Sequence, residues 1–423
     1  MSAGARPLKA AIALDGFAGL AGAEDFVVSL ADAMERTRGI NSLVAIYRRP
    51  GSQFNPRRLV AWAIRSIRAV AQGRAVPALT ERVDIAAAVE RMRRGGLPDL
   101  EVLICGPREA ALRALCRRHE IDALIPLTAA PSARFPIPWV GYIFDFQHRA
   151  LPGYFPLRER RRRDRMFGAL LAKAPTVIVN ACNVRDDASK FLGPFPAEPV
   201  VMPFSACPRP DWFERDVATV RARWNIGPRY FMISNQFWIH KRHDLALRAF
   251  SVLAAERPEP ELVCTGAIDD WRAPDYFSSL QRFIAEAGLD RRVHILGLID
   301  KRDQIALMRG AVAVIQPTEF EGGPGGGAVF DAVSLGVPTV VSDIAVNREI
   351  SNYITRYFAP GDQVALAAAM RAVLDLPTGR LDPADLLAAG AARREAMGRA
   401  LWYAVDRAME VTRARRVRTS ETA

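Results

Sequence analysis

The chain has 423 residues, which is long for one domain and sufficient for two domains of about two hundred residues each. Half of the residues are hydrophobic and a quarter are charged, a balance that excludes a disordered or fibrous protein. Lysine and arginine exceed aspartate and glutamate by 58 − 46 = 12, and this surplus favours polyanionic partners such as nucleic acid, acidic lipid or phosphorylated substrates.

The first part of the chain alternates short β-type runs with longer helical ones. Residues 10–14 form an apolar run typical of a strand, and residues 24–36 carry apolar side chains at near-helical spacing. Strands that alternate with helices form parallel β-α-β units, so the pattern predicts a doubly wound α/β sheet. The other elements expected here are strands at 42–47, 100–105, 123–127, 139–144 and 176–180, and helices at 108–118, 158–173 and 183–192, the last of which precedes an apolar pair at 200–201.

A proline-rich segment interrupts the alternation. Pro203, Pro208 and Pro210 are close together, and prolines at this density break regular elements and suit an interdomain linker. We therefore expect two Rossmann-like domains, at 1–204 and 205–395, and a segment 396–423 in which a helix packs back on the first domain before a frayed tail. The elements expected after the linker are strands at 230–234, 261–265, 293–296, 312–316 and 339–342, and helices at 243–256, 275–287, 301–309, 328–335 and 383–413.

The cysteines and the apolar runs indicate a cytoplasmic protein. The five cysteines are spaced singly, without a CxxC pair, so neither a zinc site nor a disulfide framework is expected and a reducing compartment fits best. The polar start of the chain lacks the long apolar region of a signal peptide. No stretch reaches about eighteen uncharged apolar residues, so we expect no membrane span.

Two segments concentrate the positive charge. Residues 158–165 read RERRRRDR, and residues 57–74 combine arginines with apolar residues at helical spacing. A basic amphipathic helix on an anionic membrane would have this pattern, and so would an ordinary solvated face; both interpretations stay open. Nucleic acid is not an expected partner, because aromatic residues are not interleaved with the basic runs.

Two segments of the first domain are candidates for ligand contact. The turn at 16–24, which includes Gly22, lies between a strand and a helix, where backbone amides can approach an anion; a turn that only needs positive φ would have the same glycines. Asp145 and His148 follow the strand at 139–144. Open α/β sheets bind ligands at the carboxyl ends of their strands, and a histidine there can donate to a substrate hydroxyl or phosphate.

A basic segment follows the first strand of the second domain. Residues 234–243 include Lys241 and Arg242 at the head of the next helix. Positive charge at this position adds to the helix dipole and suits a diphosphate. A solvated basic turn has the same composition, so both interpretations stay open here.

The strongest segment is 316–332. A strand ends at Gln316, a loop with five glycines follows, and a helix is expected to begin near Ala328. Backbone amides in such a loop can surround a phosphate. Glu321 and Asp331 flank the loop, and carboxylates beside a phosphate can accept hydrogen bonds from sugar hydroxyls. A flexible linker would explain the glycines but not their position between a strand and a helix, so we predict a ligand-binding loop.

Together these segments resemble the retaining glycosyltransferases of family 4, which share the glycosyltransferase-B fold of two Rossmann-like domains facing a central cleft. The family pattern P-S-x-x-E-G-F-G followed by E-A-x-x-x-G-x-P is similar to residues 317–322 and to residues 331–338. The resemblance extends to residues 22–24, 139–155 and 341–349. The DFQH sequence at 145–148 is similar to a subgroup seen among surface-polysaccharide enzymes.

The resemblance implies roles for single residues. Glu321 would contact hydroxyls of the transferred sugar, Lys241 would neutralise the diphosphate, and His148 would lie beside the donor sugar, with Asp145 in the same segment. Asp331 would bind the ribose. The other donor-binding positions expected are Gly22, Asn235, Arg242, Gly297, Ile299, Gly323, Gly325 and Gly326.

The chain departs from the family pattern in two places. Nine residues separate Glu321 from Asp331 where the family has seven, and the second acid is aspartate instead of glutamate. Asn235 stands where many members carry an arginine, so Arg242 or another arginine would have to share the diphosphate charge.

The resemblance implies a retaining hexosyltransferase with a GDP- or UDP-sugar donor and a glycan or lipid-linked glycan acceptor, in O-antigen, capsule or exopolysaccharide synthesis at the inner face of the cytoplasmic membrane. Lys241, the loop amides and helix dipoles would stabilise the leaving diphosphate, so neither a metal nor a cofactor is expected beyond the donor itself. Front-face substitution would proceed in a cleft that closes about the linker and excludes water. The alternatives are a nucleotide-sugar epimerase on the same fold, a non-catalytic sugar-nucleotide-binding scaffold, and a nucleic-acid binder.

Overall fold

The computed structural model describes residues 6, 8–14, 17, 23–39, 42–49, 90, 93, 99–270, 272–350, 355–376 and 381–421. The basic segment 57–74 and Gly22 of the predicted binding turn lie outside these described residues. No helix in the described ranges combines the length and the apolar character that a bilayer crossing demands.

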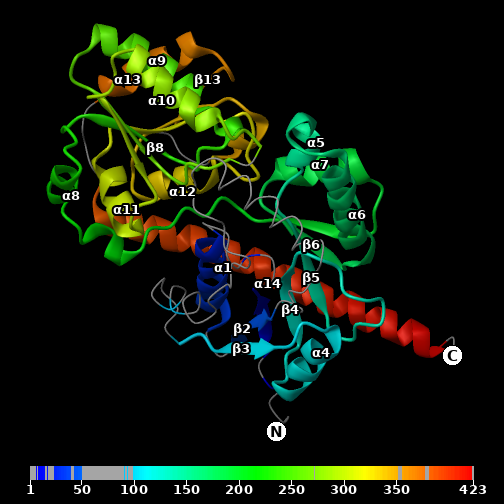
Figure 1. The fold of residues 1–423 in the computed structure, drawn as a ribbon. Coiled ribbons are helices and arrows are strands. Elements are labelled where there is room, and N and C mark those ends of the chain that lie inside the picture. Colours follow the sequence, from blue (N-terminus) through cyan, green and yellow to red (C-terminus); the bar gives the residue numbers. More distant parts are fainter. Residues whose placement is uncertain are drawn as a thin grey trace. The chain divides into compact units, whose positions relative to one another are not determined.

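The first sheet, as far as the chain is described, has seven strands in the order β3-β2-β1-β4-β5-β6-β7. Its described pairings are parallel, and β1 pairs with both β2 and β4. The strands β1, β4 and β5 are buried along their whole length, which is typical of a parallel sheet that helices cover on both faces. The elements are β1 (Ala10–Ala13), α1 (Ala23–Arg38), β2 (Leu43–Arg48), β3 (Val102–Cys105), α4 (Glu109–Arg118), β4 (Ala123–Leu127), β5 (Trp139–Ile143), α5 (Gln147–Ala150), the 3-10 turn η2 (Pro152–Tyr154), α6 (Leu157–Lys173), β6 (Thr176–Val179), α7 (Cys182–Leu192) and β7 (Glu198–Val201) (Figure 1).

The second sheet has six strands among the described residues, in the order β10-β9-β8-β11-β12-β13. Its pairings are parallel, and aliphatic and aromatic side chains of the strands and helices form its two main buried clusters. The elements are η3 (Pro210–Phe213), α8 (Val217–Arg223), β8 (Tyr230–Ser234), η4 (Ile239–Lys241), α9 (His243–Glu256), β9 (Glu261–Thr265), α10 (Tyr276–Glu286), β10 (Val293–Gly297), α11 (Lys301–Gly310), β11 (Ala313–Gln316), α12 (Gly326–Ser334), β12 (Thr339–Ser342), η5 (Ala345–Glu349), β13 (Thr355–Phe358) and α13 (Gln363–Leu374) (Figure 1).

The doubly wound α/β class predicted from the alternation is confirmed by both sheets. The helix after the glycine loop begins at Gly326 instead of near Ala328, because Gly325 and Gly326 adopt positive φ and turn the chain directly into α12. The pattern missed α8, α13 and β13. The short helix α8 begins where the Asp216 side chain accepts a hydrogen bond from the Thr219 amide, a local capping signal that apolar periodicity does not report.

Contacts within the chain group it into two compact units, 1–141 with 173–176 and 402–423, and 142–172 with 177–401. The boundary expected at 204/205 stays a prediction. In the first unit, the last part of α14 (Pro383–Glu421) packs against α1: Trp402 is 1% exposed, and its Nε1 donates to the Met34 carbonyl over 2.9 Å. The second unit contains the loops discussed next.

Candidate active site

The loops that follow β8 and β11 meet at one point of the second sheet. β8 pairs with β11, and the strand order reverses there, because β9 and β10 extend the sheet on one side and β12 and β13 on the other. Open α/β sheets bind ligands at such a switch point, outside the carboxyl ends of the strands. Residues 235–242 and 317–325 occupy this position, and the segment 145–148 belongs to the same unit.

Lys241 and Glu321 form an ion pair across these two loops. Lys241 Nζ lies 2.5 Å from Glu321 Oε1, and the two side chains are only 11% and 7% exposed. The Gln316 side-chain amide donates to the same carboxylate oxygen over 2.5 Å, and Asn235 Nδ2 donates to Gln316 Oε1. Asn235, Gln316, Glu321 and Lys241 are therefore joined in one chain of polar contacts at the switch point.

The glycine loop approaches this carboxylate closely. A Cβ on Gly326 would lie 2.7 Å from Glu321 Oε2, and Gly325 and Gly326 have φ of +66° and +62°, a region that glycine adopts at little cost. The Gly325 amide donates to Asn347 Oδ1 over 2.9 Å, and a Cβ on Gly323 would lie 3.4 Å from the Asn180 side chain. The first amides of α12 lack acceptors within the helix, so they and the helix dipole are suited to an anion.

Asp145 lies against the same loop. A Cβ on Gly322 would be 3.0 Å from Asp145 Oδ2 and from the Phe144 carbonyl oxygen. Burial raises the pKa of Asp145, while the hydrogen bond from the Gln147 amide and the charge of Lys241 oppose the rise. The structure therefore brings Asp145 into the same electrostatic environment as Lys241.

His148 is fully buried within the second unit. Its Nε2 lies 2.9 Å from Asp164 Oδ1, its ring packs edge-on against Phe167, and its Nδ1 has no partner among the described residues. Burial lowers the pKa of His148 although Asp164 opposes the shift. The hydrogen bonds and ion pairs of the described residues do not join it to Lys241 or Glu321.

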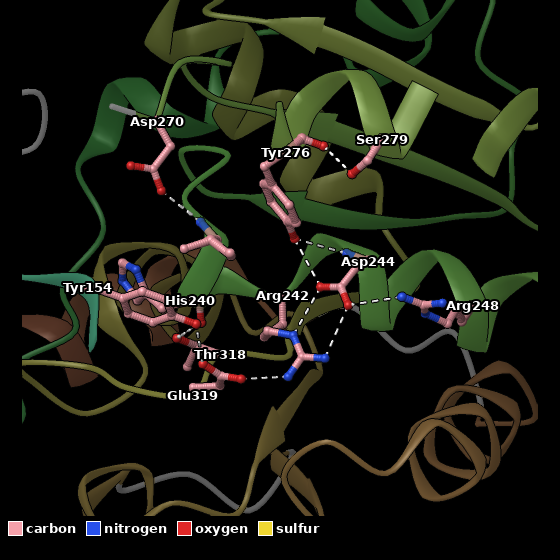
Figure 2. A network of polar contacts seen from close by, with 11 residues as sticks. Tyr154, His240, Arg242, Asp244, Arg248, Asp270, Tyr276, Ser279, Thr318 and Glu319 are labelled. Carbon is pink, nitrogen blue, oxygen red and sulfur yellow. Dashed lines mark hydrogen bonds and ion pairs between the residues drawn. The ribbon is translucent and has the colours of Figure 1, made fainter. Parts of the chain in front are cut away.

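Arg242 contacts other carboxylates than Lys241 does, namely those of Asp244 and Glu319 (Figure 2). Its guanidinium donates to Asp244 over 3.0 and 3.1 Å and to Glu319 over 2.6 Å. The hydrogen bonds that Arg242 donates to Asp244 and to Glu319 raise its pKa, and the bond to Asp244 makes the largest contribution. Tyr154 donates to the other Glu319 oxygen over 3.3 Å.

The remaining predicted positions lie at the ends of β10 and on α12. Asp331 pairs with Lys301 at 2.6 Å, and the two side chains are 16% and 33% exposed. Gly297 has φ of +64° with open space beside its Cα, and Ile299 packs against the buried cluster below. The Asp331–Lys301 pair joins α12 to the start of α11.

Sequence reasoning missed several residues that build the site. The sequence pattern marks Gln316 only as the end of a strand, yet its side-chain amide bridges Asn235 and Glu321. Asn347 is fully buried and holds both the Gly325 amide and the Ser342 carbonyl. A polar residue directly before a glycine loop was the available signal for Gln316; a single sequence carries no comparable signal for Asn347.

Residues 216–387 match the family described as glycosyl transferases group 1. This stretch of the chain is therefore similar to group 1 glycosyl transferases. It contains β8 to β13, the Lys241–Glu321 pair and the glycine loop. A comparison with curated proteins finds no match.

Solved structures agree in fold over nearly the whole chain. HepE of Anabaena, in complex with UDP and glucose, has a TM-score of 0.58 at 14% identity over 98% of this chain and 100% of its own. A glycosyltransferase from Rickettsia africae has a TM-score of 0.60 at 13% identity and covers 97% of this chain and 99% of its own. Sucrose-phosphate synthase from Thermosynechococcus elongatus has a TM-score of 0.57 at 16% identity and covers 98% of this chain and 100% of its own. The predicted glycosyltransferase-B fold is therefore confirmed.

Proposed function

We propose that the protein is a retaining hexosyltransferase that takes its sugar from a nucleotide-diphosphate donor. The observation that carries this proposal is the nearly buried Lys241–Glu321 pair beside the start of α12, within the stretch that matches the group 1 glycosyl transferases. A cation, a helix N-terminus and a carboxylate in one place suit a diphosphate linked to a sugar. HepE was solved with UDP and glucose, which favours a uridine diphosphate donor over a guanosine one.

In this mechanism the ion pair opens when the donor binds. Lys241 Nζ leaves Glu321 for the diphosphate, where its charge and the first amides of α12 stabilise the leaving group. Glu321 then accepts hydrogen bonds from the sugar, still held by Gln316. The acceptor attacks from the face of the leaving diphosphate, and a phosphate oxygen takes the acceptor proton, so the configuration at the sugar carbon is retained.

Asp145 and His148 have supporting roles in this mechanism. Burial raises the pKa of Asp145, which makes its carboxyl group a candidate to exchange a proton or a hydrogen bond with the sugar. Burial lowers the pKa of His148, which favours the neutral imidazole. Asp164 contacts its Nε2, and its Nδ1 is the atom that the donor sugar would meet. Asp331 would bind the ribose after releasing Lys301, and Gly297 and Ile299 would border the base.

We propose a lipid-linked glycan at an anionic membrane surface as the acceptor. Helix α6 presents Arg158, Arg161 and Arg165, which are exposed and carry no ion pair within the described residues. Leu157 beside them is 54% exposed. Arginines next to an exposed apolar side chain suit lipid phosphates at the interface. Co-sedimentation with phosphatidylglycerol vesicles, but not with neutral vesicles, is the expected result, and equal binding to both would count against this acceptor.

The donor site is tested by thermal shift with UDP, GDP and their sugars on the wild type, Lys241→Ala and Lys173→Ala. Lys173 is exposed, so its substitution controls for loss of a positive charge. We expect one diphosphate family to stabilise the wild type and Lys173→Ala by mass action but not Lys241→Ala. No shift with any diphosphate would refute the proposal.

Product analysis with the stabilising donor then separates the activities. Sugar transfer to added lipid-linked glycan, with the donor configuration kept, supports the retaining transferase. Isomerised nucleotide sugar would indicate the epimerase, and binding without turnover would indicate a scaffold.

A further inference from the structure

Arg242 adopts a backbone conformation that is unusual for its side chain. Its φ of 54° and ψ of 46° lie in the left-handed region, between η4, which ends at Lys241, and α9, which begins at His243. This conformation disfavours a residue other than glycine by about tenfold or more. Something in the surroundings of Arg242 must therefore hold the turn.

The side chain of Arg242 supplies that restraint. Its guanidinium binds Asp244 in a two-point contact. Asp244 also accepts a hydrogen bond from the Tyr276 hydroxyl over 3.0 Å and one from the more exposed Arg248 over 3.4 Å. The third contact, to Glu319, reaches the loop after β11. Bidentate guanidinium–carboxylate contacts fix geometry as well as charge.

Two ion pairs consequently join the same two segments. Lys241 binds Glu321, and its neighbour Arg242 binds Glu319. The backbone adds a further link, because the Glu319 amide donates to the His240 carbonyl over 2.9 Å. Figure 2 shows Arg242 between Asp244 and Glu319. The left-handed turn sends these neighbouring cations to different carboxylates.

We infer that Arg242 is a positioning residue for Lys241 and not a ligand of the donor diphosphate, with Glu319 as the second half of the clamp. The inference rests on the proposed function, since it assigns Lys241 the diphosphate. It also distinguishes the two acidic residues of the loop: Glu319 holds the turn, whereas Glu321 competes with the diphosphate for Lys241. The two roles predict opposite effects of the same chemical substitution.

The test measures diphosphate affinity by calorimetry in Glu319→Gln, Arg242→Ala, Arg242→Gly and Lys241→Ala, using the nucleoside diphosphate that stabilises the wild type. We expect Glu319→Gln and Arg242→Ala each to weaken diphosphate binding about fivefold to tenfold. The double variant should bind no more weakly than the weaker-binding single variant, because both substitutions break the same clamp. Arg242→Gly should recover most of the affinity, since glycine adopts the left-handed turn without help. If Arg242 contacted the diphosphate directly, Glu319→Gln would tighten diphosphate binding, and Arg242→Gly would bind no more tightly than Arg242→Ala. Either result overturns the inference.

A second measurement keeps the inference independent of the proposed function. Hydrogen exchange of peptides covering residues 239–243 should be faster in Arg242→Ala and Glu319→Gln than in the wild type. The exchange rate of Arg242→Gly should lie between that of the wild type and those of these two variants. Unchanged exchange in both variants overturns the clamp. If Lys241→Ala leaves diphosphate affinity unchanged while exchange responds as expected, the proposed function fails and the clamp stands.

Discussion

Replacing Glu321 by glutamine separates the two roles of the buried ion pair. The substitution keeps the size of the side chain but removes the negative charge that Lys241 meets at 2.5 Å. Removing one partner of a buried pair costs about 3–5 kcal/mol. We expect the lower end, about 3 kcal/mol of unfolding free energy, because the Asp145 carboxyl group remains close enough to interact with Lys241.

The same substitution should strengthen diphosphate binding. In the wild type a diphosphate must displace Glu321 from Lys241, whereas in Glu321→Gln the cation is available. A hydrogen bond to a charged group contributes about 1.5–3 kcal/mol, so about tenfold tighter binding is expected, together with a loss of sugar transfer. Urea unfolding and calorimetry with UDP and GDP measure the two effects.

Glu256→Gln is the matched control, because Glu256 pairs with Arg371 at the surface and is 47% exposed. Surface pairs contribute about 0–1 kcal/mol, so this variant should unfold and bind like the wild type. If Glu321→Gln binds the diphosphate no more tightly than the wild type, while Lys241→Ala abolishes binding, the competition between carboxylate and diphosphate is refuted.

Three further outcomes follow from the packing of the site. Gly326→Ala should slow sugar transfer and lower the free energy of unfolding by about 1–2 kcal/mol, because φ is +62° and a Cβ would reach Glu321. Gly327→Ala is the control, because the space beside Gly327 is open. Equal effects of the two substitutions in turnover and unfolding assays would contradict the argument. Asn347→Ala should cost about 2–3 kcal/mol in urea unfolding, since it leaves the buried Gly325 amide and Ser342 carbonyl without this partner; a loss below about 0.5 kcal/mol would refute it. Burial lowers the pKa of His243 to about 3. Below the pKa of about 6.5 that histidine has in the unfolded chain, the unfolded chain therefore binds a proton that the folded chain does not. The contribution of His243 to stability falls as the pH drops below about 6.5 and is constant above it. His243→Phe, which can keep the stacking on Phe237, should reduce that slope by about 1.4 kcal/mol per pH unit between pH 6 and 4, and an unchanged slope would show that His243 titrates normally.

The sequence by itself determined the fold class and the position of the glycine loop. Apolar runs and helical periodicity are local, and burial of parallel strands on both faces makes them visible in one sequence. The sequence also predicts Lys241 and Glu321 as site residues. Lys241 carries a positive charge at the start of a helix, and Glu321 directly precedes the glycine loop. Their direct contact across 80 positions of the chain was beyond that reasoning.

Only the tertiary structure decided which polar groups meet. The reversal of strand order between β8 and β11 brings residues 235–242 against 317–325, and this is a property of the whole sheet. The sequence placed Arg242 at the head of a helix as a candidate for the diphosphate, but it could not report that the guanidinium contacts Asp244 and also Glu319, which is 77 positions away. Local patterns report which segments become strands and helices, whereas the partner of a charged side chain depends on the register and order of strands far apart in the sequence.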